Sequence, residues 1–124
     1  MLGDVSETQL EAVAASVTEA RHVARDVAAE LPAEIGDRLE LVVSELASNA
    51  VRHAHTPFRL TISADPTVRV EVADGNGAFP RPRTPDPWGE GGRGLVLVAA
   101  CALSWGVNRL GTGKVVWADL GPAR

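Results

Sequence analysis

The sequence has a single cysteine, Cys101, so an internal disulfide bond is excluded. Cys101 lies in an apolar run, where a cysteine is more often a small buried residue than a reactive thiol. Long hydrophobic runs are also lacking, since the longest, residues 95–103, is too short to cross a bilayer. The first twenty residues are acidic and contain no signal-peptide pattern. We therefore expect a cytoplasmic protein with no membrane partner.

Positive charge is not in excess, because the formal net charge is -4. Phosphate backbones recruit basic surfaces, so this balance argues against direct binding of nucleic acid. Hydrophobic residues make up 45% and charged residues 23%, as in ordinary globular proteins. At 124 residues, the sequence predicts a single domain over residues 1–124.

The first half of the chain has mainly helical periodicity. We expect a short edge strand at residues 10–13, followed by a helix at residues 16–30. Ser16 and Glu19 match a capping box at the start of that helix. A second helix is expected at residues 34–54, where apolar side chains recur at helical spacing.

The second half alternates with a period of two residues, which is typical of strands. Residues 58–64 and 68–72 predict one antiparallel hairpin, and residues 105–110 and 114–120 predict another. Between them, residues 75–94 are rich in glycine and proline and read as a lid loop. The expected fold is α+β: a two-layer sandwich of a mixed, mostly antiparallel sheet with helices on one face.

The second expected helix carries a row of polar residues at its apolar border. Glu45, Asn49 and His53 are spaced four apart, and each step of four rotates the row by roughly 40°. Arg52 lies beside them. A glutamate can deprotonate a hydroxyl, an asparagine offers Mg²⁺ an oxygen ligand, and an arginine can bind phosphate. On spacing alone, a solvated helix face explains the row equally well.

Two glycine-rich segments add polar features. Asp74 ends a strand and precedes Gly75 and Gly77. A carboxylate in such a place can accept a hydrogen bond from an exocyclic amine. Taken alone, however, this pattern is better explained as an ordinary turn. Residues 89–94 precede a helix, whose N-terminal N–H groups can surround a phosphate. A flexible linker is an equally good reading of that segment. The pattern of residues 89–94 matches neither a Walker loop nor a Rossmann turn.

The order of these segments resembles the GHKL ATPase superfamily, which includes gyrase and histidine kinases. Residues 45–54 (ELASNAVRHA) resemble its N box, and residues 72–77 (VADGNG) resemble its first glycine box. Residues 89–98 and 111–117 are similar to the second glycine box and the terminal strand box. The resemblance covers residues 10–120 and implies a Bergerat-type ATP-binding fold.

The resemblance also implies roles for individual residues. Glu45 is expected to be the general base, and Asn49 to hold Mg²⁺ at the phosphates of ATP. Arg52 stands where relatives carry a phosphate-facing cation, and Asp74 is expected to bind the adenine amino group. The other residues expected to bind ATP are His53, Gly75, Gly77, Gly92, Arg93 and Gly94.

The chain is most similar to bacterial anti-sigma factor serine/threonine kinases and their small ATP-binding relatives. This implies transfer of the γ-phosphate of ATP to a Ser or Thr of an antagonist protein of the STAS type, with a sigma factor as second partner. Only the resemblance points to a homodimer. The alternative is a non-catalytic ATP-binding module that switches a protein partner. It is favoured because the first glycine box is irregular, with Gly75 directly after Asp74, and because the family's threonine near the adenine is replaced here by Val115 or Val116.

Overall fold

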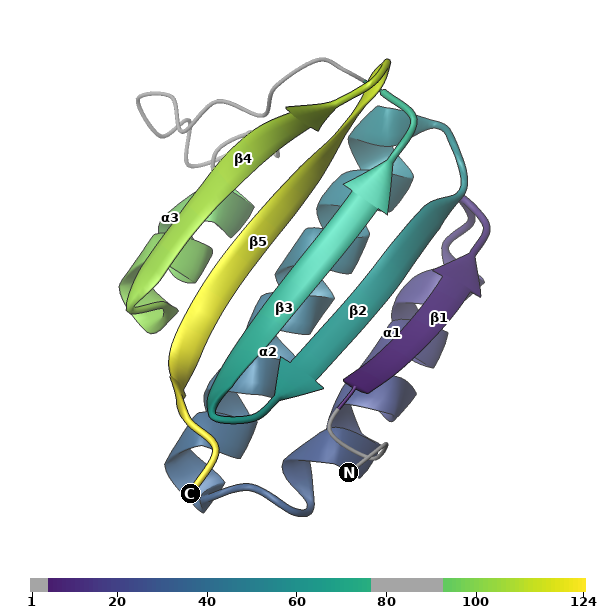
Figure 1. The fold of residues 1–124 in the computed structure, drawn as a ribbon. Helices are drawn as coiled ribbons and strands as arrows, with labels where there is room; N and C mark the ends of the chain where they lie inside the picture. The colour runs from purple at the N-terminus through teal and green to yellow at the C-terminus, as the bar shows by residue number, and fades with distance from the viewer. Residues whose placement is uncertain (1–4, 77–92) are drawn as a thin grey trace.

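The computed structural model describes residues 5–76 and 93–124 of the chain (Figure 1). Its elements follow in the order β1 (Val5–Leu10), α1 (Ala15–Ala28), α2 (Ala33–Asn49), the π-helix η2 (Ala50–Ala54), β2 (Phe58–Ala64), β3 (Thr67–Asp74), α3 (Arg93–Cys101), β4 (Ser104–Leu110) and β5 (Gly113–Pro122).

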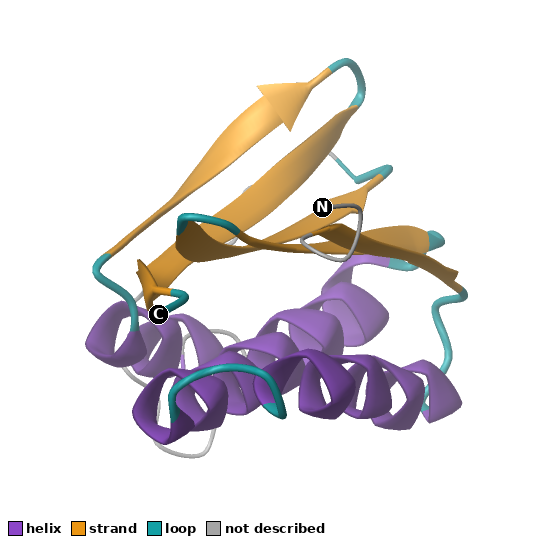
Figure 2. Ribbon diagram, turned by 60° about the horizontal axis from the view of Figure 1, so that its bottom comes forward, coloured by secondary structure: helices purple, strands orange, loops and turns teal. Residues whose placement is uncertain are grey.

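The strands form one five-stranded sheet in the order β1-β2-β3-β5-β4. Every neighbouring pair in it is antiparallel. The helices all lie against one face of the sheet, so the described residues form two layers (Figure 2). This confirms the predicted α+β sandwich, and the sheet is antiparallel at each described pairing rather than mixed. Both predicted hairpins are present.

The core lies between the two layers. Along β3, Val68, Val70 and Val72 are buried because alternate residues of a strand point to the same face. They meet the apolar stripe of α2, which includes Leu39 and Leu46. Burying one such side chain is worth about 1.5–3 kcal/mol, so the sheet and α2 hold each other in place.

The N-terminal boundaries differ from the prediction. The edge strand is Val5–Leu10 rather than residues 10–13. The capping box is wrong: α1 begins at Ala15, and its N-cap residue, Ala14, makes no side-chain capping hydrogen bond. Ser16 instead lies inside the first turn with 4% of its surface exposed. Its backbone N–H donates to the carbonyl of Val13, so the local turn and the packing of α1 place the helix start.

The second helix changes type at its end. It runs as an α-helix to Asn49 and continues as the π-helix η2 to Ala54. It ends at His55, which has a left-handed backbone (φ 57°). Pro57 disfavours a helical conformation at the residue before it, which agrees with this stop. Single turns of π-helix often mark functional sites, and this one carries Arg52 and His53.

The predicted lid falls mostly on residues 77–92, which lie outside the described residues. The described parts of that segment are its start, Gly75 and Asn76, and its end, where Arg93 opens α3. Among the described residues, no helix is both long and apolar enough to cross a membrane.

Candidate nucleotide-binding site

Three elements meet at one end of the molecule, and two of them carry the predicted site residues Arg52, His53 and Asp74. The π-helix η2, the end of β3 and the start of β5 meet there, at the top of Figure 1. The arrangement follows from the antiparallel pairing of β3 with β5, which sets the last residue of one against the first residues of the other. The start of β1 and the C-terminus lie at the opposite end (Figure 1).

Asp74 and Lys114 form a buried ion pair at the centre of this end. They are direct partners in the β3–β5 register. Lys114 Nζ lies 3.1 Å from Asp74 Oδ1, and the two side chains are 7% and 3% exposed. Both lie at the parity of the buried valines of their strands, so both side chains point toward the helix layer.

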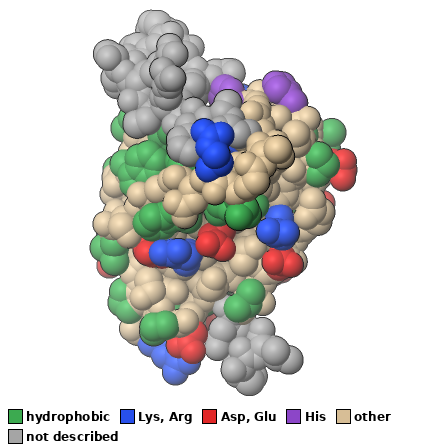
Figure 3. All heavy atoms as spheres, turned by 45° about the horizontal axis from the view of Figure 1, so that its top comes forward, with side chains coloured by type: hydrophobic (Ala, Val, Ile, Leu, Met, Phe, Trp, Pro, Cys, Tyr) green, Lys and Arg blue, Asp and Glu red, His purple; other side chains and the backbone are tan. Residues whose placement is uncertain are grey.

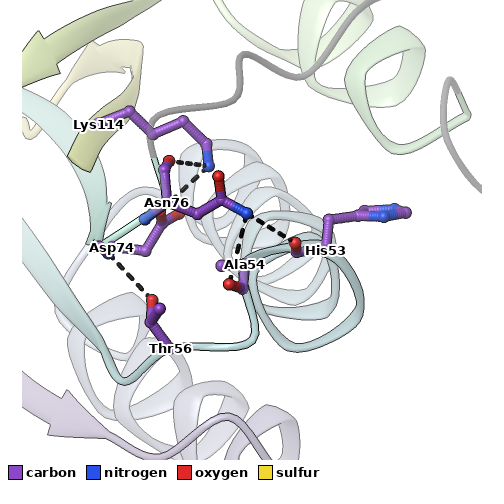
Figure 4. Close-up of polar contacts among 7 residues, drawn as sticks. His53, Ala54, Thr56, Asp74, Asn76 and Lys114 are labelled. Carbon is purple, nitrogen blue, oxygen red and sulfur yellow. Dashed lines mark hydrogen bonds and ion pairs between the residues drawn. The ribbon is translucent and has the colours of Figure 1, made fainter. Parts of the chain in front are cut away.

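The turn after β3 is tied to this pair and to η2 (Figure 4). The backbone N–H of Asn76 donates to Asp74 Oδ1 at 2.8 Å, and Lys114 Nζ donates to the carbonyl of Asn76 at 2.8 Å. The side-chain amide of Asn76 donates to the carbonyl of His53 at 3.1 Å. Gly75 donates its N–H to the hydroxyl of Thr56 at 3.0 Å. These bonds fix where the Asp74 carboxylate lies relative to the helix.

Asn49 and Glu45 lie on the last turns of α2, and both are partly buried. The side-chain oxygen Oδ1 of Asn49 is buried and has no hydrogen-bond partner within the described part of the chain. A buried acceptor without a donor is destabilising unless it is satisfied by a ligand, water or ion. Mg²⁺ takes oxygen ligands and keeps several waters, so Asn49 fits the metal role expected of it.

No group of three or more His, Cys, Asp or Glu side chains among the described residues could hold a metal.

Arg52 and His53, on η2, are exposed. The imidazole of His53 points away from Asp74, and only its backbone carbonyl joins the network (Figure 4). The space-filling view of this end shows histidine side chains at the surface (Figure 3). The structure thus brings the His53 backbone, rather than its side chain, to the site.

The remaining predicted ATP-binding residues, four glycines and Arg93, divide into three groups. Gly75 belongs to the network, although a Cβ atom there would make only ordinary contact, at 3.4 Å, with Thr56. Gly77 and Gly92 lie outside the described residues. Arg93 and Gly94 are the first residues of α3.

Comparison with known proteins agrees with this arrangement. The family model for the histidine kinase-like ATPase domain matches residues 10–120. The chain belongs to this family.

Solved structures give the same fold. The RsbU and RsbW domains of Rv1364c from Mycobacterium tuberculosis match with a TM-score of 0.74 and 17% identity, over 97% of this chain and 33% of that one. The histidine kinase domain of the blue-light activated histidine kinase EL346 from Erythrobacter litoralis matches with a TM-score of 0.58 and 23% identity. That match covers 87% of this chain and 60% of the other, so this chain spans only part of both proteins. No curated protein matches the sequence.

Lys114 is the residue of this histidine kinase-like ATPase domain that sequence reasoning missed. We expected Val115 or Val116 to stand where relatives carry a threonine near the adenine, and we did not single out Lys114, which is the residue that faces Asp74. Its signal is visible in the sequence: the inward positions of β5 are otherwise apolar, at Val116, Ala118 and Leu120. A lysine at the same parity breaks that pattern.

Proposed function

We propose that this domain binds ATP with Mg²⁺ and acts as a serine/threonine kinase of the anti-sigma factor type. The observation that carries the proposal is the buried Asn49 oxygen, which no donor reaches from residues 5–76 or 93–124; it lies one helical turn after Glu45 and at the same end as Asp74. Family membership implies ATP binding. Asn49 offers an oxygen for the metal, Glu45 a carboxylate for the hydroxyl of the phosphate acceptor, and Asp74 a carboxylate for the adenine.

Each residue would have a separate task. Bound Mg²⁺ would neutralise phosphate charge and orient the γ-phosphate for transfer. Asn49 would hold the metal, and Arg52 would face the phosphates from the exposed side of η2. Glu45 would accept the proton of the attacking Ser or Thr hydroxyl. Asp74, held by Lys114 and the Asn76 turn, would accept a hydrogen bond from the base.

The protein partners follow from the same proposal. The phosphate acceptor would be a Ser or Thr of a STAS-type antagonist protein, and the sequestered partner a sigma factor. We also propose that residues 1–124 form one domain, that the protein is cytoplasmic, and that it assembles as a homodimer.

Nucleotide binding is tested by thermal unfolding with and without ATP and Mg²⁺. A ligand that binds only the native state at 100 times its Kd adds about 2.7 kcal/mol to stability, so the melting temperature should rise. An unchanged melting temperature at millimolar ATP and Mg²⁺ would contradict the proposal.

Phosphate transfer is tested with Glu45→Gln, which keeps the shape of the side chain and removes its basicity. Incubation with labelled ATP, Mg²⁺ and candidate antagonist proteins should phosphorylate one of them, and the variant should lose transfer while retaining ATP binding. Glu34→Ala, on the same helix and with an exposed side chain, is the matched control. Equal phosphate transfer by Glu45→Gln and by the wild type would exclude Glu45 as the general base.

A non-catalytic ATP-binding module is the second candidate. Two features favour it: the family's threonine near the adenine is missing, and Asp74, the carboxylate proposed to bind the adenine, is paired with Lys114. It predicts that ATP raises the melting temperature, that no antagonist protein is phosphorylated, and that Glu45→Gln changes neither result.

A further inference from the structure

Lys114 is the only lysine of the chain, which otherwise uses arginine, at eleven positions, for its permanent positive charges. The ammonium of a lysine is strongly hydrated and is usually exposed. Here the side chain is 7% exposed and lies beside the carboxylate expected to read the base. Burying two charges has a large desolvation penalty, so a contribution to stability does not by itself explain why a lysine is placed here.

Within the part of the chain that the structure describes, the hydrogen bonds of the pair leave one N–H donor of Lys114 and one carboxylate oxygen of Asp74 without a partner. Lys114 Nζ has three N–H donors, of which one serves Asp74 Oδ1 and one serves the carbonyl of Asn76. Asp74 Oδ1 accepts from both Lys114 and the Asn76 N–H. Among the described residues, no hydrogen bond reaches the second carboxylate oxygen or the third N–H. The pair thus keeps a donor and a neighbouring acceptor for a further partner.

A donor beside an acceptor matches more than one purine. Adenine presents a donor, its 6-amino group, next to the acceptor N1, whereas a 6-oxopurine presents the acceptor O6 next to the donor N1–H. A carboxylate alone can accept a hydrogen bond from the 6-amino group of adenine. It repels the O6 of a 6-oxopurine, because both groups are acceptors and neither carries a proton. Lys114 supplies a proton for O6, while Asp74 still accepts from N1–H.

We propose that Lys114 determines base specificity, and that it widens the site to 6-oxopurine nucleotides, GTP and ITP, alongside ATP. The inference rests on the proposed nucleotide-binding function. A purely structural role for Lys114, as a brace for the Asn76 turn, differs in its consequence: its removal would weaken all three nucleotides equally.

The test compares the Kd of ATP, GTP and ITP with Mg²⁺ by calorimetry, on the wild type and on Lys114→Met. The triphosphate is shared, so differences report the base, and ITP separates the effect of O6 from that of the 2-amino group of GTP. We expect the three nucleotides to bind the wild type within about tenfold of one another. Lys114→Met should weaken GTP and ITP at least about tenfold more than ATP, as expected for one well-placed hydrogen bond to a charged group.

Arg59→Met is the matched control, since it removes one positive charge from an exposed position of β2. It should leave the order of the three affinities unchanged.

A second measurement avoids any risk that Lys114→Met fails to fold. Selective ¹⁵N labelling of lysine side chains gives a single ammonium signal, because Lys114 is the only lysine. Both ITP and ATP should shift this signal in the wild type.

Wild-type discrimination against GTP and ITP by more than about a hundredfold would overturn the inference, as would equal loss of all three nucleotides in Lys114→Met. In either case the proposed ATP function would stand. If ATP itself does not bind, the proposed function fails together with the inference.

Discussion

Lys114 and Asp74 face each other across β5 and β3 with 3.1 Å between Nζ and Oδ1, on the side of the sheet that the helices cover. The same two groups hold the backbone of Asn76, whose side chain reaches the end of η2. The ion pair thereby helps to hold the turn after β3 against the end of η2.

Removing one member of this pair should destabilise the protein strongly. Asp74→Ala leaves the Lys114 ammonium buried without its carboxylate, and breaking a buried pair in this way costs about 3–5 kcal/mol. The double variant Asp74→Ala/Lys114→Met should recover most of the loss, because no buried charge remains. Urea unfolding of the two single variants and the double variant measures the coupling. Additive losses would contradict a direct interaction.

Asn49→Ala should separate binding from stability. Asn49 Oδ1 has no protein donor within the described part of the chain, so its removal breaks no such hydrogen bond. We expect the free energy of unfolding without ligand to stay within about 1 kcal/mol of the wild type. The rise in melting temperature with ATP and Mg²⁺ should be lost. Asn108→Ala, at an exposed position of β4, is the control for the substitution itself. A full thermal shift in Asn49→Ala would exclude Asn49 as the metal ligand.

Gly113→Ala should disturb the site through the backbone. A Cβ atom at Gly113 would overlap the carbonyl oxygen of Asp74, which cannot move without shifting the β3–β5 pairing. Overpacking of this kind costs about 1–3 kcal/mol, and we expect ATP affinity to fall with it. Gly111→Ala is the comparison: it has a positive φ of 62° and no atom within 4 Å, so it should lower stability by about 1 kcal/mol and leave ATP binding unchanged.

Asp119 should make the free energy of unfolding depend on pH under acidic conditions. On the open face of the sheet, Arg69 donates two hydrogen bonds to it at 2.6 and 2.8 Å. These bonds lower the pKa of Asp119 below its ordinary value of 3.8. A lowered carboxyl pKa stabilises the fold above pH 3.8, and the contribution is lost as the pH falls through the folded-state pKa.

Asp119→Asn should therefore be less stable than the wild type at pH 7, by about 1 kcal/mol at most, because the pair is partly exposed. The difference should shrink below pH 3.8. Urea unfolding at several pH values measures it. A difference that does not change with pH would show that the charge of Asp119 does not contribute.

Local pattern determined the elements of this protein. The alternation of residues 58–72 and 105–120 placed both hairpins, since strand residues of one parity must share a face. The apolar stripe of the second helix placed its buried face, and the order of motifs indicated the family. Where local signals compete with packing, they failed: the Ser16 capping box is absent because α1 begins one residue earlier and buries that serine.

Tertiary structure alone decided which polar groups meet. Glu45 and Asn49 share a helix, so their spacing was readable from the sequence, whereas Asp74 and Lys114 are forty residues apart and meet only through the β3–β5 register. Register depends on pairing between distant strands, which no local pattern contains. The sequence by itself thus determined the fold class and the expected ATP site. Only the folded sheet set the single lysine against Asp74, the carboxylate that we propose binds the adenine.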